Sequence, residues 1–311
     1  MRLLVGSRGS KLSLMQTEHV LSLLKGIDDS LEFEIVTIRT KGDMDARPLY
    51  KIDGKGVFEK EVDQAVLSGN VHFAVHSMKD VPSDLHDDLI IAAVPRRDSP
   101  YDMLICKGNG SLMSLPSNSI IGTSSLRRLV QLRRVRGDIV VKPIRGNIDT
   151  RLAKMLNGEY DAVVLAEAGL SRLGLLGLEF KVERLSKDIM MPAPGQGALA
   201  VVTRRDNTEL IRLLKRIEDR GSRAEVDAER MLLRMINAGC RMPLGALARV
   251  YPPDLLTLDA CILSIDGKNV IRAGASSSMD DAEGLGARVA RSLMEQGASS
   301  ISEEWRSVTV E

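Results

Sequence analysis

The feature that most constrains the fold is a regular alternation of short apolar runs with segments of helical periodicity over the first two-thirds of the chain. The runs at residues 2–5, 32–39 and 71–75 have the length and apolar content of buried strands. Between the first two, residues 11–25 place apolar side chains on one helical face, and Gly26 follows as a stop signal. This alternation of strands and helices predicts a mostly parallel sheet with helices on its faces.

A second series of the same kind follows a proline-containing break at residues 95–100. Before the break, we expect a helix at 57–68 and a strand at 89–94. After the break, we expect strands at 103–107, 120–123, 139–142 and 162–165, and helices at 125–136 and 148–157. The Pro/Gly segment MPAPGQG (191–197) is interpreted as a hinge, and the apolar run 198–202 as a return to the first unit. The sequence therefore predicts two α/β units of similar size.

The last third of the chain has a different pattern. Ser222 and Glu225 have the spacing of a capping box for a helix that extends to about residue 237. Runs at 247–250, 256–265 and 269–273 alternate as antiparallel strands do, and an Asp-Gly pair at 266–267 suits a hairpin turn. Asp280 and Glu283 are expected to cap a closing helix. These signals predict a separate small α+β domain from about residue 220.

Charge and composition exclude several classes of protein. The chain has 43 basic and 42 acidic side chains, a net charge of +1 and 3% aromatic residues, whereas a nucleic-acid-binding protein would need a basic excess and stacking aromatics. No apolar stretch approaches the roughly 20 residues that span a bilayer, and the N-terminus lacks the apolar region of a signal peptide. The three cysteines show no paired spacing, so a reducing, cytoplasmic location is expected.

Four junctions that follow predicted strands carry most of the candidate functional groups. In α/β units, ligand sites lie at the carboxyl ends of the strands, where helix N-termini direct amides at anions. The junctions are the segments 7–10, 76–80, 122–128 and 145–151. Their arginines can grip carboxylates or phosphates with a planar fork of donors. Together they predict a cationic cleft for a ligand with several anionic groups.

Each arginine has a competing interpretation as a solvated side chain. Arg127 and Arg128 lie in the first turn of a predicted helix, where a cation is unfavourable unless an anion compensates it. Arg145 and Arg151 flank another strand–helix junction, which also favours anion binding. For Asp80, an internal ion pair with Lys79 or a neighbouring arginine and a catalytic role are equally compatible with the sequence.

The remaining reactive residues are less decisive. Lys51 and Lys55 lie in a glycine-containing stretch that suits either a lid over the cleft or a plain surface loop. The HxxxH pair formed by His72 and His76 lies in a predicted strand, which separates the rings too far for a metal pair. Cys240 follows a helix stop and precedes an arginine, so it is either a reactive thiol or an inert one; Cys106 and Cys261 are expected to be inert within strands.

These residues together resemble the porphobilinogen deaminase (hydroxymethylbilane synthase) family over essentially the whole chain. The segments that carry the resemblance are AVHSMKDVP (74–82), GTSSLRR (122–128), RGNIDTRL (145–152), GEYDAVVLA (158–166) and PGQGAL (194–199). One minor departure is Ala238, at a position where the family often has glycine.

The resemblance implies an α/β fold with two periplasmic-binding-protein-like α/β domains and a small C-terminal α+β domain. The implied boundaries are 1–96 with 197–217 for domain 1, 97–196 for domain 2 and 218–311 for domain 3. It also implies a dipyrromethane cofactor bound to Cys240 through a thioether. On that primer, a transferase of tetrapyrrole (heme) biosynthesis condenses four porphobilinogen molecules with loss of ammonia and releases hydroxymethylbilane. A cytoplasmic monomer that binds neither nucleic acid nor membrane is expected.

The resemblance further implies a role for each matched residue. Asp80 is implied to be catalytic and to contact the cofactor together with Lys79. The other implied cofactor-binding residues are Ser125, Arg127, Arg128 and Arg151, and the implied substrate-binding residues are Arg8, Ser10, Thr123, Arg145 and Arg172. Lys51, Lys55 and Phe58 match the family's mobile loop at 43–60, and Gln196 matches its hinge.

Two rival functions use the same features. A non-catalytic, two-lobed solute-binding protein could use the same anion-binding strand ends, but it would not need Asp80 or Cys240. An acyl- or phosphoryl-transfer enzyme could use a cationic cleft, but the sequence has no phosphate-binding loop, metal set or Ser-His-Asp pattern to support one.

Overall fold

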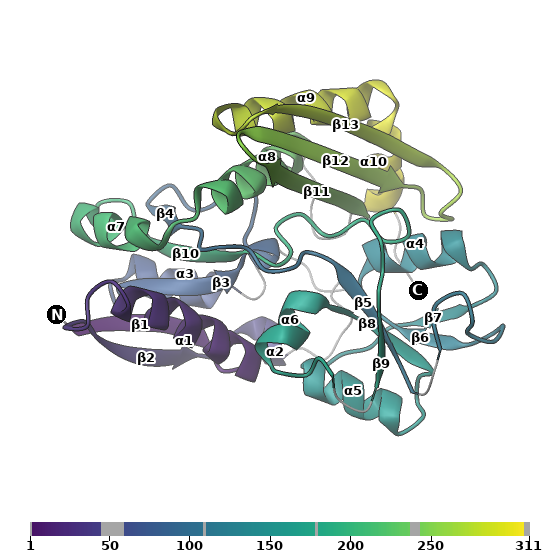
Figure 1. Cartoon of the computed structure of the whole chain (residues 1–311), viewed down its shortest axis with the longest axis horizontal. Coiled ribbons are helices and arrows are strands. Elements are labelled where there is room, and N and C mark those ends of the chain that lie inside the picture. Colours follow the sequence, from purple (N-terminus) through teal and green to yellow (C-terminus); the bar gives the residue numbers. More distant parts are fainter. Residues whose placement is uncertain (1, 45–58, 108–109, 178–179, 237–242, 308–311) are drawn as a thin grey trace.

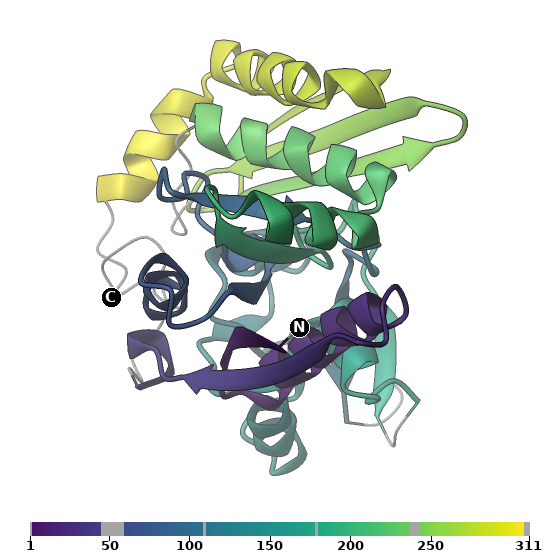
Figure 2. The same ribbon diagram turned by 90° about the vertical axis from the view of Figure 1, so that its left-hand side faces the viewer.

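The structure is a computed structural model that describes residues 2–44, 59–107, 110–177, 180–236 and 243–307. Within these ranges the chain forms three sheets, each with its own helices (Figure 1). The two mixed sheets lie side by side, and the third lies above both with α9 on its outer side (Figures 1 and 2). The arrangement matches the predicted fold class of two α/β units and a small C-terminal α+β unit.

The first sheet has the strand order β2-β1-β3-β10-β4. Its strands are β1 (Arg2–Arg8), β2 (Glu32–Ile38), β3 (Phe73–Ser77), β4 (Leu89–Ala93) and β10 (Leu199–Arg204). Only β10 is antiparallel to its neighbours, so the predicted mostly parallel sheet and the predicted return of the chain are both confirmed. Apolar side chains of α1 (Lys11–Lys25) and α7 (Thr208–Leu214) pack on one face, and those of α3 (Lys60–Leu67) on the other; the short helix α2 (Lys41–Met44) follows β2.

The second sheet has the order β7-β6-β8-β5-β9, and β5 alone is antiparallel to its neighbours. Its strands are β5 (Asp102–Cys106), β6 (Ile120–Gly122), β7 (Val140–Lys142), β8 (Ala162–Ala166) and β9 (Lys181–Arg184). The helix α4 (Leu126–Val135) packs on one face, while α5 (Ile148–Leu156) and α6 (Glu167–Arg172) pack on the other. Covering both faces explains why β8 reads as an uninterrupted apolar run.

The third sheet is an antiparallel meander of β11 (Leu244–Tyr251), β12 (Leu255–Leu263) and β13 (Val270–Ser278). It packs against α8 (Arg220–Ile236), α9 (Ala282–Glu295) and α10 (Ala298–Ser307). Asp266 and Gly267 form the turn between β12 and β13, as predicted; Gly267 has φ +72°, a conformation that glycine adopts without strain.

The two chain segments that connect the first two sheets, residues 94–101 and 185–198, lie side by side where residues 97–98 meet 196–197, and this contact is called the crossing. The Asp98 amide donates to the Gly197 carbonyl at 3.2 Å, and Arg97 Nε donates to the Gln196 carbonyl at 3.0 Å. Gly197 has φ +89°, and a Cβ there would lie 2.5 Å from the Asp98 carbonyl oxygen. Only glycine permits this approach, so the MPAPGQG segment forms a tight double crossing.

The two capping predictions in the last third are wrong. The helix α8 begins at Arg220, and Asp219 Oδ1 accepts the Ser222 amide at 2.8 Å, while Ser222 Oγ accepts the Arg97 amide at 2.8 Å. Asp280 pairs with Arg220, and Asp281 is the N-cap residue of α9. The side chains of Ser222 and Asp280 therefore make contacts with distant segments instead of capping their own helices.

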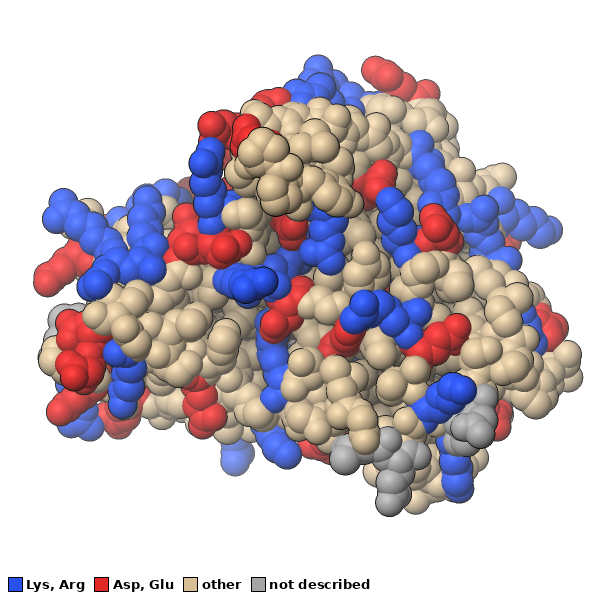
Figure 3. Space-filling model, viewed as in Figure 1, with Lys and Arg blue, Asp and Glu red and all other residues tan. Residues whose placement is uncertain are grey.

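No described helix is long and apolar enough to cross a bilayer. On the face shown in Figure 3, lysines and arginines are interspersed with acidic residues. That face therefore carries no continuous basic surface, in agreement with the balanced composition.

Candidate active site

The predicted polar junctions of the first sheet lie at the ends of two adjacent parallel strands. Arg8 is the last residue of β1, and Ser10 is the N-cap of α1, where its Oγ accepts the Ser13 amide at 3.2 Å. Lys79 and Asp80 lie in the 3₁₀ turn Met78–Asp80 directly after β3. Because parallel strands end at the same edge of a sheet, these two junctions share one edge.

The junctions of the second sheet are built in the same way. Thr123 follows β6, and its Oγ1 accepts the Ser125 amide at 3.2 Å. Ser125 is the N-cap of α4 and accepts the Arg128 amide. Arg145 and Arg151 follow β7, and Arg151 lies in α5. The hydroxyls at these junctions accept hydrogen bonds at the loop and helix start, and each still has a proton to donate to a ligand.

The buried carboxylate of Asp102, at the start of β5, is a functional group that the sequence analysis missed. Its Oδ2 lies 2.8 Å from Arg127 Nη1, and its Oδ1 lies 2.7 Å from Arg128 Nη2. Burial alone would raise the pKa of Asp102, but the two guanidiniums hold it well below its usual range. The first-turn arginines are therefore compensated by the protein's own anion, and Asp80 is not the only carboxylate among the cations.

Gln196 joins this cluster to the first sheet. Its Nε2 donates to the Pro100 carbonyl at 2.6 Å and to Asp102 Oδ1 at 3.1 Å, while Lys79 Nζ donates to its Oε1 at 3.3 Å. The crossing segment thus brings Lys79 from one sheet to the arginines of the other. Cationic side chains from the junctions of both α/β units therefore lie in one hydrogen-bonded cluster.

The cluster has more positive charge than its carboxylates balance. The Lys79 side chain is exposed to solvent, and desolvation by the protein packed around it lowers its pKa to about 8 although Asp80 opposes the shift. Burial, with repulsion from Arg128 and Arg145, lowers the pKa of Arg151 to about 10. Cations destabilised in this way gain stability when an anionic ligand binds beside them.

Glu59, at the start of α3, is a second residue that the sequence did not identify. Its side chain is almost completely buried, and desolvation together with the negative charge of Asp80 raises its pKa to about 9. The positive charge of Arg8 opposes the shift without cancelling it. Glu59 is therefore protonated near neutral pH, and it can donate a hydrogen bond that an ionised carboxylate could not.

Arg172 makes contacts that the sequence did not anticipate. Its Nε donates to Asp98 Oδ2 at 2.8 Å, and its Nη2 donates to the Gly197 carbonyl at 2.7 Å. Both acceptors belong to the crossing segments. Arg172 therefore links the two segments of the crossing, and a contact with a substrate would be made in addition to these two hydrogen bonds.

A network of charges ties the crossing to the third sheet. Arg97 Nη1 lies 2.9 Å from Glu229 Oε1 and 3.1 Å from Glu225 Oε2, and both acids belong to α8. Glu229 also accepts the amides of Gly195 and Ala248. Glu225, expected to cap its own helix, instead accepts the Val250 amide at 3.1 Å. The helix α8 is thereby fixed at the crossing, and it ends at Ile236, just before the segment that contains Cys240.

Four of the predicted site residues lie outside the described residues. These are Lys51, Lys55, Phe58 and Cys240. Cys106 and Cys261 are described, buried and unpaired, as predicted, and burial raises the pKa of both thiols. Among the described residues no cluster of His, Cys, Asp and Glu could hold a metal ion; the His76 ring instead lies 3.1 Å from Asp63.

Comparison with known proteins gives one consistent family. The profile described as "Porphobilinogen deaminase, dipyromethane cofactor binding domain" matches residues 3–212, and "Porphobilinogen deaminase, C-terminal domain" matches residues 223–295. A probable porphobilinogen deaminase from Nitrosopumilus maritimus is 46% identical over 98% of this chain and 97% of its own. A porphobilinogen deaminase from Geobacillus kaustophilus is 45% identical over 97% and 96%, respectively.

Among solved structures, the likeness is looser. The periplasmic VFT2 domain of BvgS from Bordetella pertussis is 18% identical and covers 70% of this chain and 86% of its own, with a TM-score of 0.41. The two profiles and the curated relatives span nearly the whole chain, including every junction described above. The chain belongs to the porphobilinogen deaminase family.

Proposed function

We propose that this chain is a hydroxymethylbilane synthase: it condenses four porphobilinogen molecules head to tail, with loss of one ammonia at each step, and releases the linear tetrapyrrole by hydrolysis. The observation that carries the proposal is the cluster of Lys79, Arg127, Arg128 and Arg151 at the strand ends of two units, in excess over its carboxylates. Each porphobilinogen carries an acetate and a propionate, so a growing chain needs several such cations.

The residues present fit a dipyrromethane cofactor. Its carboxylates would lie against Lys79, Arg127, Arg128 and Arg151, whose charges gain stability from an added anion. When bound, the cofactor supplies the pyrrole carbon to which the first substrate is joined. We propose that it is attached to Cys240 through a thioether, which places it on the segment that directly follows α8.

The substrate is proposed to bind through Arg8, Ser10, Thr123, Arg145 and Arg172. Loss of ammonia from its aminomethyl group leaves a cation conjugated with the pyrrole ring. Asp80, in the turn after β3, is proposed to stabilise that cation and to accept the proton lost when the new bond forms. The charges of Lys79 and the arginines hold the carboxylates away from Asp80, so that it remains available to the ring.

We further propose three domains with the limits 1–96 with 197–217, 97–196 and 218–311. The three separate sheets support this division, and Leu126 and Val130 of α4 form the apolar contact between the second unit and the third. Lys51, Lys55 and Phe58 are proposed to belong to a lid at 43–60, and Gln196 to the hinge between the first two domains. The enzyme is proposed to act as a cytoplasmic monomer without nucleic-acid or membrane partners.

The test is an assay of porphobilinogen consumption and ammonia release by the purified chain and by Asp80→Asn. The substitution keeps the shape of the side chain and removes its charge, so turnover should fall by about 100-fold or more while the fold and the bound cofactor remain. Near-normal turnover by Asp80→Asn would contradict its catalytic role. Failure of the unaltered chain to consume porphobilinogen would contradict the proposed function itself.

A further inference from the structure

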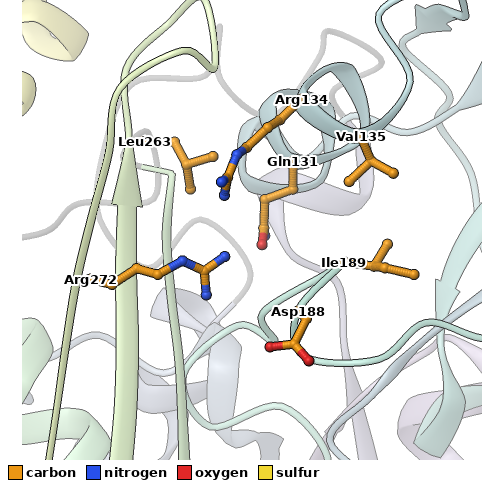
Figure 4. A pocket seen from close by; sticks show the side chains of 7 residues that line it. All are labelled: Gln131, Arg134, Val135, Asp188, Ile189, Leu263 and Arg272. Carbon is orange, nitrogen blue, oxygen red and sulfur yellow. The ribbon is translucent and has the colours of Figure 1, made fainter.

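A small cavity lies between the second and third sheets, away from the junctions described above. Its volume is about 250 Å³, and it is lined from four directions: by α4, by the segment between β9 and β10, by the end of β12 and by β13. Figure 4 shows that the side chains of Arg134, Arg272 and Asp188 point into the same space. The cavity therefore combines two cations and one anion that come from three separate parts of the chain.

Arg134, Arg272 and Asp188 are each exposed, and among the described residues none of the three makes an ion pair. Gln131, which also lines it, is already engaged, because its Nε2 donates to the Met191 carbonyl and its Oε1 accepts the Met191 amide. The guanidiniums of Arg134 and Arg272 point into the same solvent-filled cavity, where water weakens their mutual repulsion, and an anion bound between them would attract both. The carboxylate of Asp188 in addition favours a ligand that carries a cationic or hydrogen-bond-donating group.

The walls and volume of the cavity limit the ligand further. Two guanidiniums and one carboxylate leave one net positive charge, which favours a ligand with one net negative charge. The volume of about 250 Å³ is many times the roughly 10–15 Å³ that a single water needs, so the cavity can hold a small organic molecule. Val135, Ile189 and Leu263 supply an apolar lining that fits a short hydrocarbon spacer.

We propose that this cavity is a binding site for a small aminodicarboxylate, whose carboxylates lie against Arg134 and Arg272 and whose ammonium lies against Asp188. An acidic amino acid such as glutamate has this chemistry, and so does the larger porphobilinogen. A ligand bound here contacts α4 of the second sheet and β13 of the third, so it links the two units. The site is separate from the proposed active site and does not depend on it.

The chain contains a natural reporter for this site. Trp305 is its single tryptophan, and the indole Nε1 donates to the carbonyl of Leu263 at 2.9 Å. Because Leu263 lines the cavity, a ligand there will perturb the surroundings of the indole. Tryptophan fluorescence can therefore detect occupation of this cavity in the unlabelled protein.

The experiment titrates the full-length, cofactor-loaded protein with glutamate and, as a matched ligand without the ammonium, with glutarate. Tryptophan emission and titration calorimetry are recorded on the same samples. We expect saturable binding of glutamate and weaker binding of glutarate. Arg272→Leu should weaken glutamate binding by about tenfold or more, as expected when a charge-assisted contact is lost. Asp188→Asn should remove the preference for glutamate over glutarate.

Arg133→Leu is the control, because Arg133 is an exposed arginine of the same helix that does not line the cavity. Porphobilinogen forms a separate arm, tested in Asp80→Asn protein, in which an emission change that Arg272→Leu abolishes would identify the substrate as the occupant. The proposal is overturned if neither ligand gives an emission change or heat, or if Arg272→Leu and Arg133→Leu bind equally well. Normal turnover of Arg272→Leu is expected, so failure here leaves the proposed function intact.

Discussion

Replacing Asp102 with asparagine gives the sharpest test of the charge cluster. The Asp102 side chain is completely buried, and its two oxygens lie 2.7 and 2.8 Å from Arg128 and Arg127. Asparagine has nearly the same shape but no charge, so Asp102→Asn leaves two buried guanidiniums without their anion. The change therefore removes compensation without creating a cavity.

The expected loss is large because the pair is buried. Breaking a buried pair by removing one partner costs about 3–5 kcal/mol, since the remaining charge stays desolvated. At about 2–4 °C for each kcal/mol in a protein of this size class, the melting temperature of the cofactor-free chain should fall by about 6–20 °C. Added carboxylate ligands should recover part of the loss, because they supply the missing anion.

The assay is a thermal melt of the cofactor-free protein. Asp259→Asn serves as the control, since Asp259 pairs with Lys187 at the surface and exposed pairs contribute less than about 1 kcal/mol. A drop for Asp102→Asn no larger than that for Asp259→Asn would refute the reasoning. It would mean that the arginines do not depend on Asp102.

Two further predictions use the shifted pKa values. In the cofactor-free chain the pKa of Lys79 is about 8, so the rate of cofactor loading should fall as pH rises through 8. Lys79→Arg should extend loading to higher pH, because arginine stays charged there. If Lys79→Arg lost cofactor loading over the same pH range as the unaltered chain, this role would be contradicted. The pKa of Glu59 is raised from 4.5 to about 9, so the folded state holds a proton that the unfolded state releases, and stability should decline as pH rises between these values. Glu59→Gln, which mimics the protonated acid, should have a higher melting temperature than the unaltered chain at pH 8, and that temperature should vary less with pH. A lower melting temperature of Glu59→Gln at pH 8 would count against a neutral Glu59.

The alternation of apolar runs was sufficient to predict the two α/β units. The helix expected at 11–25 has those bounds, and the expected strands of both mixed sheets lie within three residues of their observed limits. The pattern missed β9, because the four residues Lys181–Arg184 at the edge of the sheet include only one apolar residue, Val182. It also missed α6, a single short helix with a glycine inside it.

The site was predictable in kind but not in detail. The four junctions could be located because strand ends and helix starts leave local signals in the sequence. Asp102 could not, because its partners lie beyond β6 in the first turn of α4, with Arg128 26 residues further along the chain, and only the folded sheet brings them together. For the same reason Ser222 and Glu225 look like a local cap but bind the crossing segments and β11.

The central claim is that this chain builds a tetrapyrrole on a primer that it carries covalently. Intact mass spectrometry of the purified protein, before and after brief exposure to porphobilinogen, tests that claim most directly. The account predicts a mass greater than that of the bare chain by one dipyrromethane, lost in Cys240→Ser, followed by stepwise additions of single substrate units. A mass equal to that of the bare polypeptide, with no addition after porphobilinogen, would contradict it.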